Sequence, residues 1–154
     1  MSDTGVHELL LRGTCVEIRG LGVLLRGESG AGKSDLALRL IEGGAGLVAD
    51  DYVLARREGD EIRMAPPPAI AGLLEIRGVG IVRLPHVGDI KLALLVDLVP
   101  SSAVVRLPPA QTAEILGLAL PLLALNAFEA STPVKIGAWI RAMIERGFHP
   151  EASP

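Results

Sequence analysis

A glycine-rich segment near the N-terminus carries the most specific chemical pattern in this sequence. Residues 27–34 read GESGAGKS and match the phosphate-binding pattern G-x-x-x-x-G-K-[ST]. They follow an apolar stretch at residues 21–26 and precede residues that favour a helix. Glycines in such a segment expose backbone N–H groups, and the positive end of the helix adds to their attraction for phosphate oxygens. The pattern in this context predicts a P-loop rather than an ordinary glycine-rich turn.

The predicted phosphate-binding residues comprise a backbone cradle and two functional side chains. We expect the Lys33 ammonium to neutralise charge on the β- and γ-phosphates and the Ser34 hydroxyl to coordinate Mg²⁺. The full predicted set is Gly27, Glu28, Ser29, Gly30, Ala31, Gly32, Lys33 and Ser34.

Two adjacent acids, Asp50 and Asp51, follow the next apolar stretch along the chain. A P-loop needs an acidic partner that holds the metal or orients the nucleophile. One of these carboxylates is expected to act on the metal, directly or through water, while the other takes a proton from an attacking hydroxyl. The alternative is a solvated turn in which an aspartate caps the backbone.

A third charged segment contains Glu75 and Arg77. Side chains two residues apart on a strand share a face, so the pair is either a surface ion pair, worth about 0–1 kcal/mol, or part of a site. In the functional interpretation, Glu75 is a further metal ligand and Arg77 contacts a phosphate or a partner. Gly78 and Gly80 would then allow another backbone to approach closely.

The elements that must position these residues can be read from hydrophobic periodicity and from Gly and Pro. A tight turn at Arg19-Gly20 is expected to join the first two strands, and Gly43-Gly44 to end the helix after the P-loop. The strand at residues 46–49 is expected to be parallel, and residues 52–55 and 61–64 to form a hairpin. The predicted strands are residues 8–18, 21–26, 46–49, 52–55, 61–64, 73–82, 91–99 and 122–125, and the later helices are residues 111–118 and 134–146.

The composition predicts a domain with an aliphatic core. The chain has 154 residues, of which 49% are hydrophobic and only 3% aromatic, and domains usually contain roughly 100–150 residues. We therefore expect one domain over residues 1–150 and a frayed tail over residues 151–154.

Charge and hydropathy exclude several classes of function. A net charge of -3 and a pI near 5.6 give no long-range attraction to nucleic acid or to anionic membranes. The longest apolar run, residues 115–125, is shorter than the roughly 20 residues of a membrane span, and the N-terminus lacks the basic region of a secretion signal. The single cysteine, Cys15, excludes an internal disulfide and is expected to be a buried, inert thiol. These features predict a cytoplasmic protein.

Four segments together resemble the C-terminal catalytic domain of HPr kinase/phosphorylase. They are the P-loop, LVADD at residues 47–51, APPP at residues 65–68 and, most specifically, LLEIRGVGI at residues 73–81. The resemblance covers residues 13 to about 137. It implies an α/β fold: a P-loop domain of the HPr kinase and phosphoenolpyruvate carboxykinase-like type, with a mixed sheet and flanking helices.

The resemblance also implies an activity. Such an enzyme phosphorylates a serine of HPr, the phosphocarrier of the sugar phosphotransferase system, with ATP or pyrophosphate as donor and with Mg²⁺. It also catalyses the reverse phosphorolysis, in which inorganic phosphate attacks the phosphoserine. The family assembles as a hexamer, and its long forms carry an additional N-terminal domain; this chain resembles the short, alphaproteobacterial-type form.

Roles for individual residues follow from the same resemblance. Ser34 and Glu75 would hold Mg²⁺ together with Asp50. Asp51 would be the base for the serine hydroxyl, with Asp50 as the alternative for that task. The other residues with implied catalytic or substrate-binding roles are Arg106, Lys135 in the segment PVKIG, Arg77, Gly78 and Arg12.

The sequence departs from the family pattern at two places. Arg12 stands before Gly13, where the family has a catalytic histidine, and arginine does not exchange protons near neutral pH. Ala138-Trp139 replaces an arginine-asparagine pair. Both departures predict weaker phosphorolysis. They leave three hypotheses: an HPr kinase, a small-molecule kinase on the same scaffold, and a nucleotide sensor with little catalysis.

Overall fold

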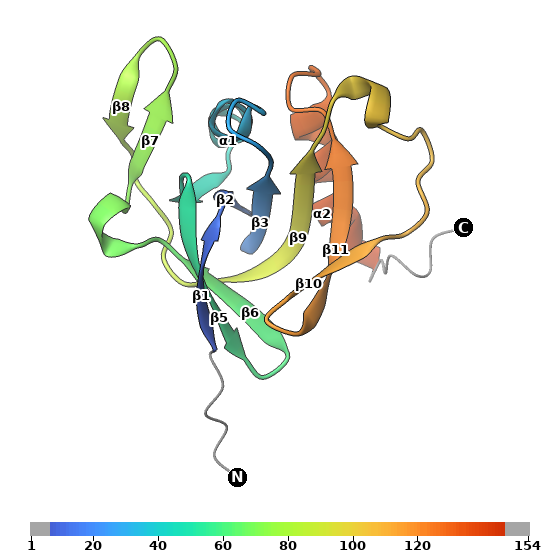
Figure 1. The fold of residues 1–154 in the computed structure, drawn as a ribbon, viewed down its shortest axis with the longest axis horizontal. Helices are drawn as coiled ribbons and strands as arrows, with labels where there is room; N and C mark the ends of the chain where they lie inside the picture. The colour runs from blue at the N-terminus through green and yellow to red at the C-terminus, as the bar shows by residue number, and fades with distance from the viewer. Residues whose placement is uncertain (1–6, 147–154) are drawn as a thin grey trace.

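The computed structural model describes residues 7–146, which form eleven strands and two α-helices (Figure 1). The helices are α1 (Lys33–Glu42) and α2 (Thr132–Arg146), and the short 3-10 helices are η1 (Pro68–Ile70) and η2 (Ser101–Ala103). The strands are β1 (Glu8–Arg12), β2 (Thr14–Ile18), β3 (Leu21–Arg26), β4 (Gly46–Ala49), β5 (Tyr52–Glu58), β6 (Glu61–Ala65), β7 (Leu73–Ile76), β8 (Gly80–Arg83), β9 (Ile90–Leu98), β10 (Thr112–Ile115) and β11 (Leu118–Leu125).

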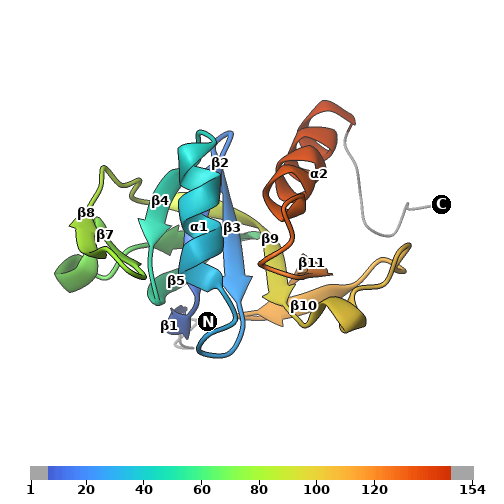
Figure 2. The ribbon, with the colours of Figure 1, turned by 90° about the horizontal axis from the view of Figure 1, so that it is seen from above.

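The long strand β9 joins the two halves of a nine-stranded mixed sheet. Its first residues pair antiparallel with β6, and its later residues pair parallel with β3 and β11. The strand order is β1-β5-β6-β9-β3-β2-β4, with β11 beside β9 and β10 beside β11, while β7 and β8 form a separate hairpin. Helices α1 and α2 flank the half that contains β3 (Figure 2). A mixed sheet with flanking helices is therefore confirmed.

Strand β3 is buried on both of its faces. Its side chains alternate, so that Leu24 packs between the two halves of the sheet while Val23 and Leu25 pack beneath the helices. Helix α1 adds Leu36 and Leu40, four residues apart, to the layer beneath the helices. Burial of each such aliphatic side chain contributes about 1.5–3 kcal/mol. The loop after β3 consequently begins and ends on firmly packed elements.

The expected strand at residues 8–18 is wrong as a single element. It breaks at Gly13 into β1, which pairs with β5, and β2, which pairs with β3 and β4. A Cβ atom at Gly13 would lie 2.9 Å from the Leu25 carbonyl oxygen. Only glycine fits where the chain crosses from one half of the sheet to the other.

The strand at residues 46–49 runs parallel to β3, but the two strands do not pair with each other. Strand β4 pairs antiparallel with β2, and its one parallel contact within residues 7–146 is a single bridge from Leu47 to His86. Because β2 lies between β3 and β4, β4 runs in the same direction as β3 without pairing with it.

The helix expected at residues 111–118 is wrong, because these residues belong to the hairpin of β10 and β11. Leu116 and Gly117 have φ values of 49° and 84°. Positive φ at both central residues of a two-residue turn is typical of a hairpin that matches the twist of its strands. Parallel pairing of β11 with β9 then fixes the hairpin to the sheet, which outweighs the local preference for a helix.

The C-terminal helix and the apolar strand before it agree with the sequence pattern. Helix α2 begins two residues before the expected start at residue 134, and β9 covers most of residues 91–99. None of the helices described between residues 7 and 146 has the length and apolarity needed to cross a membrane.

The cysteine is buried as expected. Cys15 is 0% exposed, and its burial raises the pKa of the thiol to about 12. Because the thiolate is the reactive form, this thiol is inert in the folded protein.

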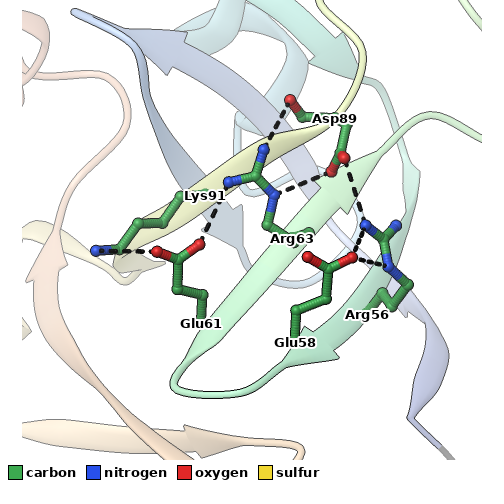
Figure 3. A network of polar contacts seen from close by, with 6 residues as sticks. All are labelled: Arg56, Glu58, Glu61, Arg63, Asp89 and Lys91. Atoms are coloured by element: carbon green, nitrogen blue, oxygen red, sulfur yellow. Dashed lines mark hydrogen bonds and ion pairs between the residues drawn. The ribbon is translucent and has the colours of Figure 1, made fainter.

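A network of charged side chains lies across β5, β6 and the residues before β9 (Figure 3). Asp89 accepts hydrogen bonds from Arg63 at 3.2 Å and from Arg56 at 3.3 Å. Desolvation raises the pKa of Asp89, but the bonds from Arg63 and Arg56 outweigh it and hold this pKa below its usual value. The remaining members are Glu58, Glu61 and Lys91.

The substitution Asp89→Asn should slightly lower the thermal midpoint at neutral pH. A depressed carboxyl pKa stabilises the folded state above the unfolded pKa, about 3.9, and this stabilisation is lost as the pH falls through the folded pKa. Since the groups are largely solvated, we expect a difference below about 3 °C. Thermal unfolding followed by circular dichroism should show this difference shrinking below about pH 4; an undiminished difference at about pH 2 would contradict the assignment.

Candidate functional site

The loop at residues 27–32 joins β3 to α1 and leaves the start of the helix open. Gly32 occupies the N-cap position with a φ of 97°, and no side chain caps the helix there. A Cβ atom at Gly32 would lie 2.7 Å from Ala127 Cβ, so the tight passage requires glycine. The unpaired N–H groups of the first turn are consequently available to an anion.

Lys33 is a buried cation at the end of the loop. Lys33 is only 8% exposed. Its Nζ donates hydrogen bonds to the backbone carbonyl oxygens of Gly27, at 2.7 Å, and of Glu28, at 3.1 Å. No carboxylate forms an ion pair with Lys33 within the described part of the chain. Two carbonyls offset only part of the cost of burying an ammonium, so the arrangement favours a bound anion.

A cavity of about 360 Å³ opens beside this loop and gathers residues from six segments. The P-loop, α1, the turn at Asp51, the β7–β8 hairpin, β1 through Arg12 and the loop after β11 all contribute to it. Its lining residues are Arg12, Ser29, Gly30, Gly32, Lys33, Ser34, Asp35, Leu38, Asp51, Glu75, Ile76, Arg77 and Phe128. The structure thus brings together most of the site residues expected from the sequence.

Asp50 is an anchored carboxylate. It is 8% exposed and accepts three hydrogen bonds: from the Thr14 hydroxyl at 3.0 Å, the Ser34 hydroxyl at 2.7 Å and the Glu75 backbone N–H at 3.1 Å. These donors come from β2, α1 and β7. Asp50 therefore ties three elements together at the edge of the cavity, and its position next to Ser34 suits a role on the metal side.

Asp51 differs from its neighbour in both backbone and exposure. The φ of Asp51 is 70°. The Tyr52 N–H donates to the backbone carbonyl oxygen of Asp50 at 2.8 Å, which closes a tight three-residue turn centred on Asp51. The Asp51 side chain is 56% exposed, with Arg12 Nε 3.9 Å from Oδ1. A strained backbone that turns a carboxylate toward a cavity is common in functional sites.

The oxygen atoms of Ser34, Asp50 and Glu75 suit a hard cation. Within residues 7–146, no cluster of three or more His, Cys, Asp or Glu side chains forms a complete metal cage. Mg²⁺ rarely uses such a cage, because it takes one or two carboxylates and completes its shell with phosphate oxygens and water. The donor set therefore fits Mg²⁺ bound together with a phosphate.

The expectation that Glu75 and Arg77 share one strand face is wrong. β7 ends at Ile76, so Arg77 lies in the turn that leads to β8. Among the described residues no ion pair joins Glu75 to Arg77, which also removes the surface ion-pair interpretation. Both residues line the cavity, whereas Gly78 lies in the exposed turn with a φ of 86°.

Two predicted residues lie away from the cavity. Arg106 is in an exposed bend between η2 and β10, and Lys135 is exposed on α2, where its Nζ lies 3.4 Å from Glu129. Neither lines the cavity of its own chain.

Sequence reasoning missed Thr14 and Phe128. The Thr14 hydroxyl donates to Asp50 and accepts from the Asp51 N–H at 3.3 Å, so this fully buried residue contacts both acids. The available signal for Thr14 was a hydroxyl residue directly before the apolar residues Cys15 and Val16. For Phe128 the signal was an aromatic residue in a chain that is only 3% aromatic.

The substitution Thr14→Val should lower the free energy of unfolding by about 1–3 kcal/mol, because it leaves Asp50 without one donor and the Asp51 N–H without its acceptor. Urea unfolding measures the change. Thr14→Ser keeps the hydroxyl and should remain close to the parent. A larger loss in Thr14→Ser than in Thr14→Val would show that the methyl group, not the hydroxyl, is what matters.

The fold and the cavity define a P-loop α/β domain with acids facing the loop. A family model described as "HPr Serine kinase C-terminal domain" matches residues 6–145, and the chain belongs to this family. This confirms the resemblance inferred from the four sequence segments.

Relatives and a solved structure agree with that membership. Proteins named HPr kinase/phosphorylase from Burkholderia lata and Burkholderia cenocepacia are each 44% identical over 119 residues, covering 70% of this chain and 37% of theirs. The chain thus spans little more than a third of the length of these relatives. A structure described as the Hpr(Ser) kinase/phosphatase from Coxiella burnetii has a TM-score of 0.79 at 27% identity, covering 88% of this chain and 90% of that one.

Proposed function

We propose that this chain is a cytoplasmic protein-serine kinase that transfers a phosphoryl group to a serine of an HPr-like phosphocarrier. The observation that carries the proposal is the buried Lys33 ammonium, which has no counter-ion among residues 7–146 and lies beside a cavity lined by Asp51 and Glu75. Family membership and the names of the relatives support the same class of activity and favour it over a small-molecule kinase.

The phosphate donor, ATP or pyrophosphate, would lie along the loop at residues 27–34. The N–H groups at the start of α1 and the Lys33 ammonium would bind its phosphate oxygens. Ser34, Asp50 and Glu75 would hold Mg²⁺, which, when bound, would neutralise charge on the transferred group. Positioning and charge neutralisation are the main contributions a protein can make to this reaction.

Asp51 is the proposed general base. Its side chain is half exposed and lines the cavity, whereas both Asp50 oxygens already accept hydrogen bonds. As the serine oxygen bonds to phosphorus, Asp51 takes the hydroxyl proton and the bond to the leaving phosphate oxygen breaks. The leaving group is a nucleoside diphosphate from ATP or inorganic phosphate from pyrophosphate.

Arg12 favours the forward reaction over phosphorolysis in this proposal. Its guanidinium lies 3.9 Å from Asp51 and 5.9 Å from the centre of the Tyr52 ring. It stays protonated, so it can bind a phosphate but cannot relay a proton.

The remaining proposed contacts concern the protein substrate and the assembly. Arg77 and Gly78 lie on the β7–β8 hairpin beside the cavity and would contact a phosphate or the phosphocarrier. Roles for Arg106 and Lys135 require a neighbouring chain, because neither lines the cavity of its own chain. The homo-oligomer implied by the resemblance, a hexamer, is tested by measuring the mass of the protein in solution.

Mass spectrometry of the cognate HPr tests the proposed activity. HPr is incubated with this protein, Mg²⁺ and either ATP or pyrophosphate, and we expect one phosphoryl group on a serine. Transfer only to small metabolites would replace the proposal with a small-molecule kinase. Tight nucleotide binding without any transfer would replace it with a nucleotide sensor.

A further inference from the structure

The cavity has two chemically different sides. Asp50 and Asp51 follow β4, and Glu75 lies on β7, on one side of α1, while the loop after β11 lies on the other side (Figure 2). In the strand order β11-β9-β3-β2-β4, the P-loop leaves the middle strand, β3. The transferred phosphate and the metal belong on the acidic side. The rest of a longer donor must therefore leave the cradle on the side of β11.

Phe128 occupies that second side. It is the one aromatic residue among residues 7–146 that lines the cavity, and it is 63% exposed. Its ring lies directly against the P-loop, because a Cβ atom at Gly32 would come within 2.9 Å of Phe128 Cζ. A large apolar ring next to a phosphate cradle cannot serve the phosphates themselves, so it suits an apolar part of the same ligand.

The segment that carries Phe128 is held by hydrogen bonds. The Phe128 N–H donates to the Asn126 side chain at 2.9 Å, and Asn126 Nδ2 donates to the Val99 oxygen at 3.0 Å. From α1, Arg39 donates to the backbone oxygens of Ala127 and Glu129. The same helix thus supplies the phosphate-binding N–H groups and fixes the loop of Phe128. This reduces the entropy lost when a ligand packs on the ring.

We propose that Phe128 forms a nucleobase subsite, in which its ring stacks on the base of a nucleotide donor; this inference rests on the proposed phosphate-binding function. An aromatic ring stacks on any base because every base has a π-face. The subsite selects a nucleotide over pyrophosphate, which has no base to stack. Phe128 is thus a specificity-determining residue for the donor.

Calorimetric binding of ADP and of pyrophosphate, each with Mg²⁺, tests this subsite. Phe128→Ala should raise the dissociation constant for ADP about tenfold, the effect typical of a lost base stack. The dissociation constant for pyrophosphate should stay within about twofold of the parent value, since pyrophosphate does not reach the ring. Phe128→Trp should retain tight ADP binding. Ile144→Ala, at an exposed apolar residue of α2 outside the cavity, is the matched control.

The ratio of the two dissociation constants separates the possible outcomes. An equal weakening of ADP and pyrophosphate would assign Phe128 a structural role and overturn the subsite, as would no change for either ligand. A loss of oligomer mass in Phe128→Ala with unchanged ADP binding would make the ring an interface between copies of the chain. If the parent protein binds pyrophosphate and binds ADP no more tightly, only the subsite is contradicted. If the parent protein binds neither ligand, the proposed function fails as well.

Discussion

The variant Lys33→Ala should lose phosphoryl transfer to HPr by at least about a thousandfold, comparable to removing a major charge-stabilising group from an active site. In the parent, the backbone carbonyl oxygens of Gly27 and Glu28 accept hydrogen bonds from the Lys33 ammonium. Its charge is therefore in place before a ligand arrives. The fold should not suffer, because the substitution removes a buried charge that has no counter-ion in the described structure. Transfer is measured by mass spectrometry of HPr, and stability by thermal unfolding.

Two further variants make the Lys33 result specific. Lys91→Ala removes a half-exposed lysine of the network in Figure 3 and should leave transfer unchanged. Lys33→Arg keeps the charge but changes its shape, and a compact ammonium and a planar guanidinium are not interchangeable at a phosphate site. Parental transfer rates in Lys33→Ala would show that the loop is not the donor site.

The variant Asp51→Asn should reduce transfer by about 10²- to 10⁴-fold, the usual contribution of a general base. Its stability should remain close to that of the parent for two reasons. The side chain is 56% exposed, and asparagine tolerates a positive φ as readily as aspartate. Single-turnover transfer to HPr measures the chemical step, and thermal unfolding measures the stability.

Asp50→Asn is the matched comparison for Asp51→Asn. Asp50 accepts three hydrogen bonds, so an amide NH₂ in place of one oxygen would face a donor. We expect a loss of stability of about 1–3 kcal/mol together with lost activity. If Asp51→Asn remains active while Asp50→Asn is inactive but stably folded, the two acids exchange their proposed roles.

Much of the site could be predicted because its signals are local. The P-loop is a contiguous segment, and the apolar residues before and after it have the periods of a strand and a helix. Strand β3, helix α1 and the residues at 27–32 between them occupy the expected places. The segments around Asp50 and Glu75 were also short and specific enough to predict that their side chains would meet the loop.

Contacts between distant segments could not be predicted in the same way. The hairpin of β10 and β11 replaced an expected helix because pairing with β9, a strand from another part of the sequence, outweighed local preference. The break at Gly13 likewise reflects the approach of Leu25 and not a property of its immediate neighbours.

The sequence was sufficient to identify the P-loop segment, the family and the acids proposed to act on the donor, since each depends on residues adjacent in the chain. It could not distinguish Asp50 from Asp51, which are neighbours of the same type. Their difference arises from hydrogen bonds that Thr14, Ser34 and Glu75 bring from three other elements. Phe128 reached the cavity for the same reason: the parallel pairing of β11 with β9 places the end of β11 beside the P-loop.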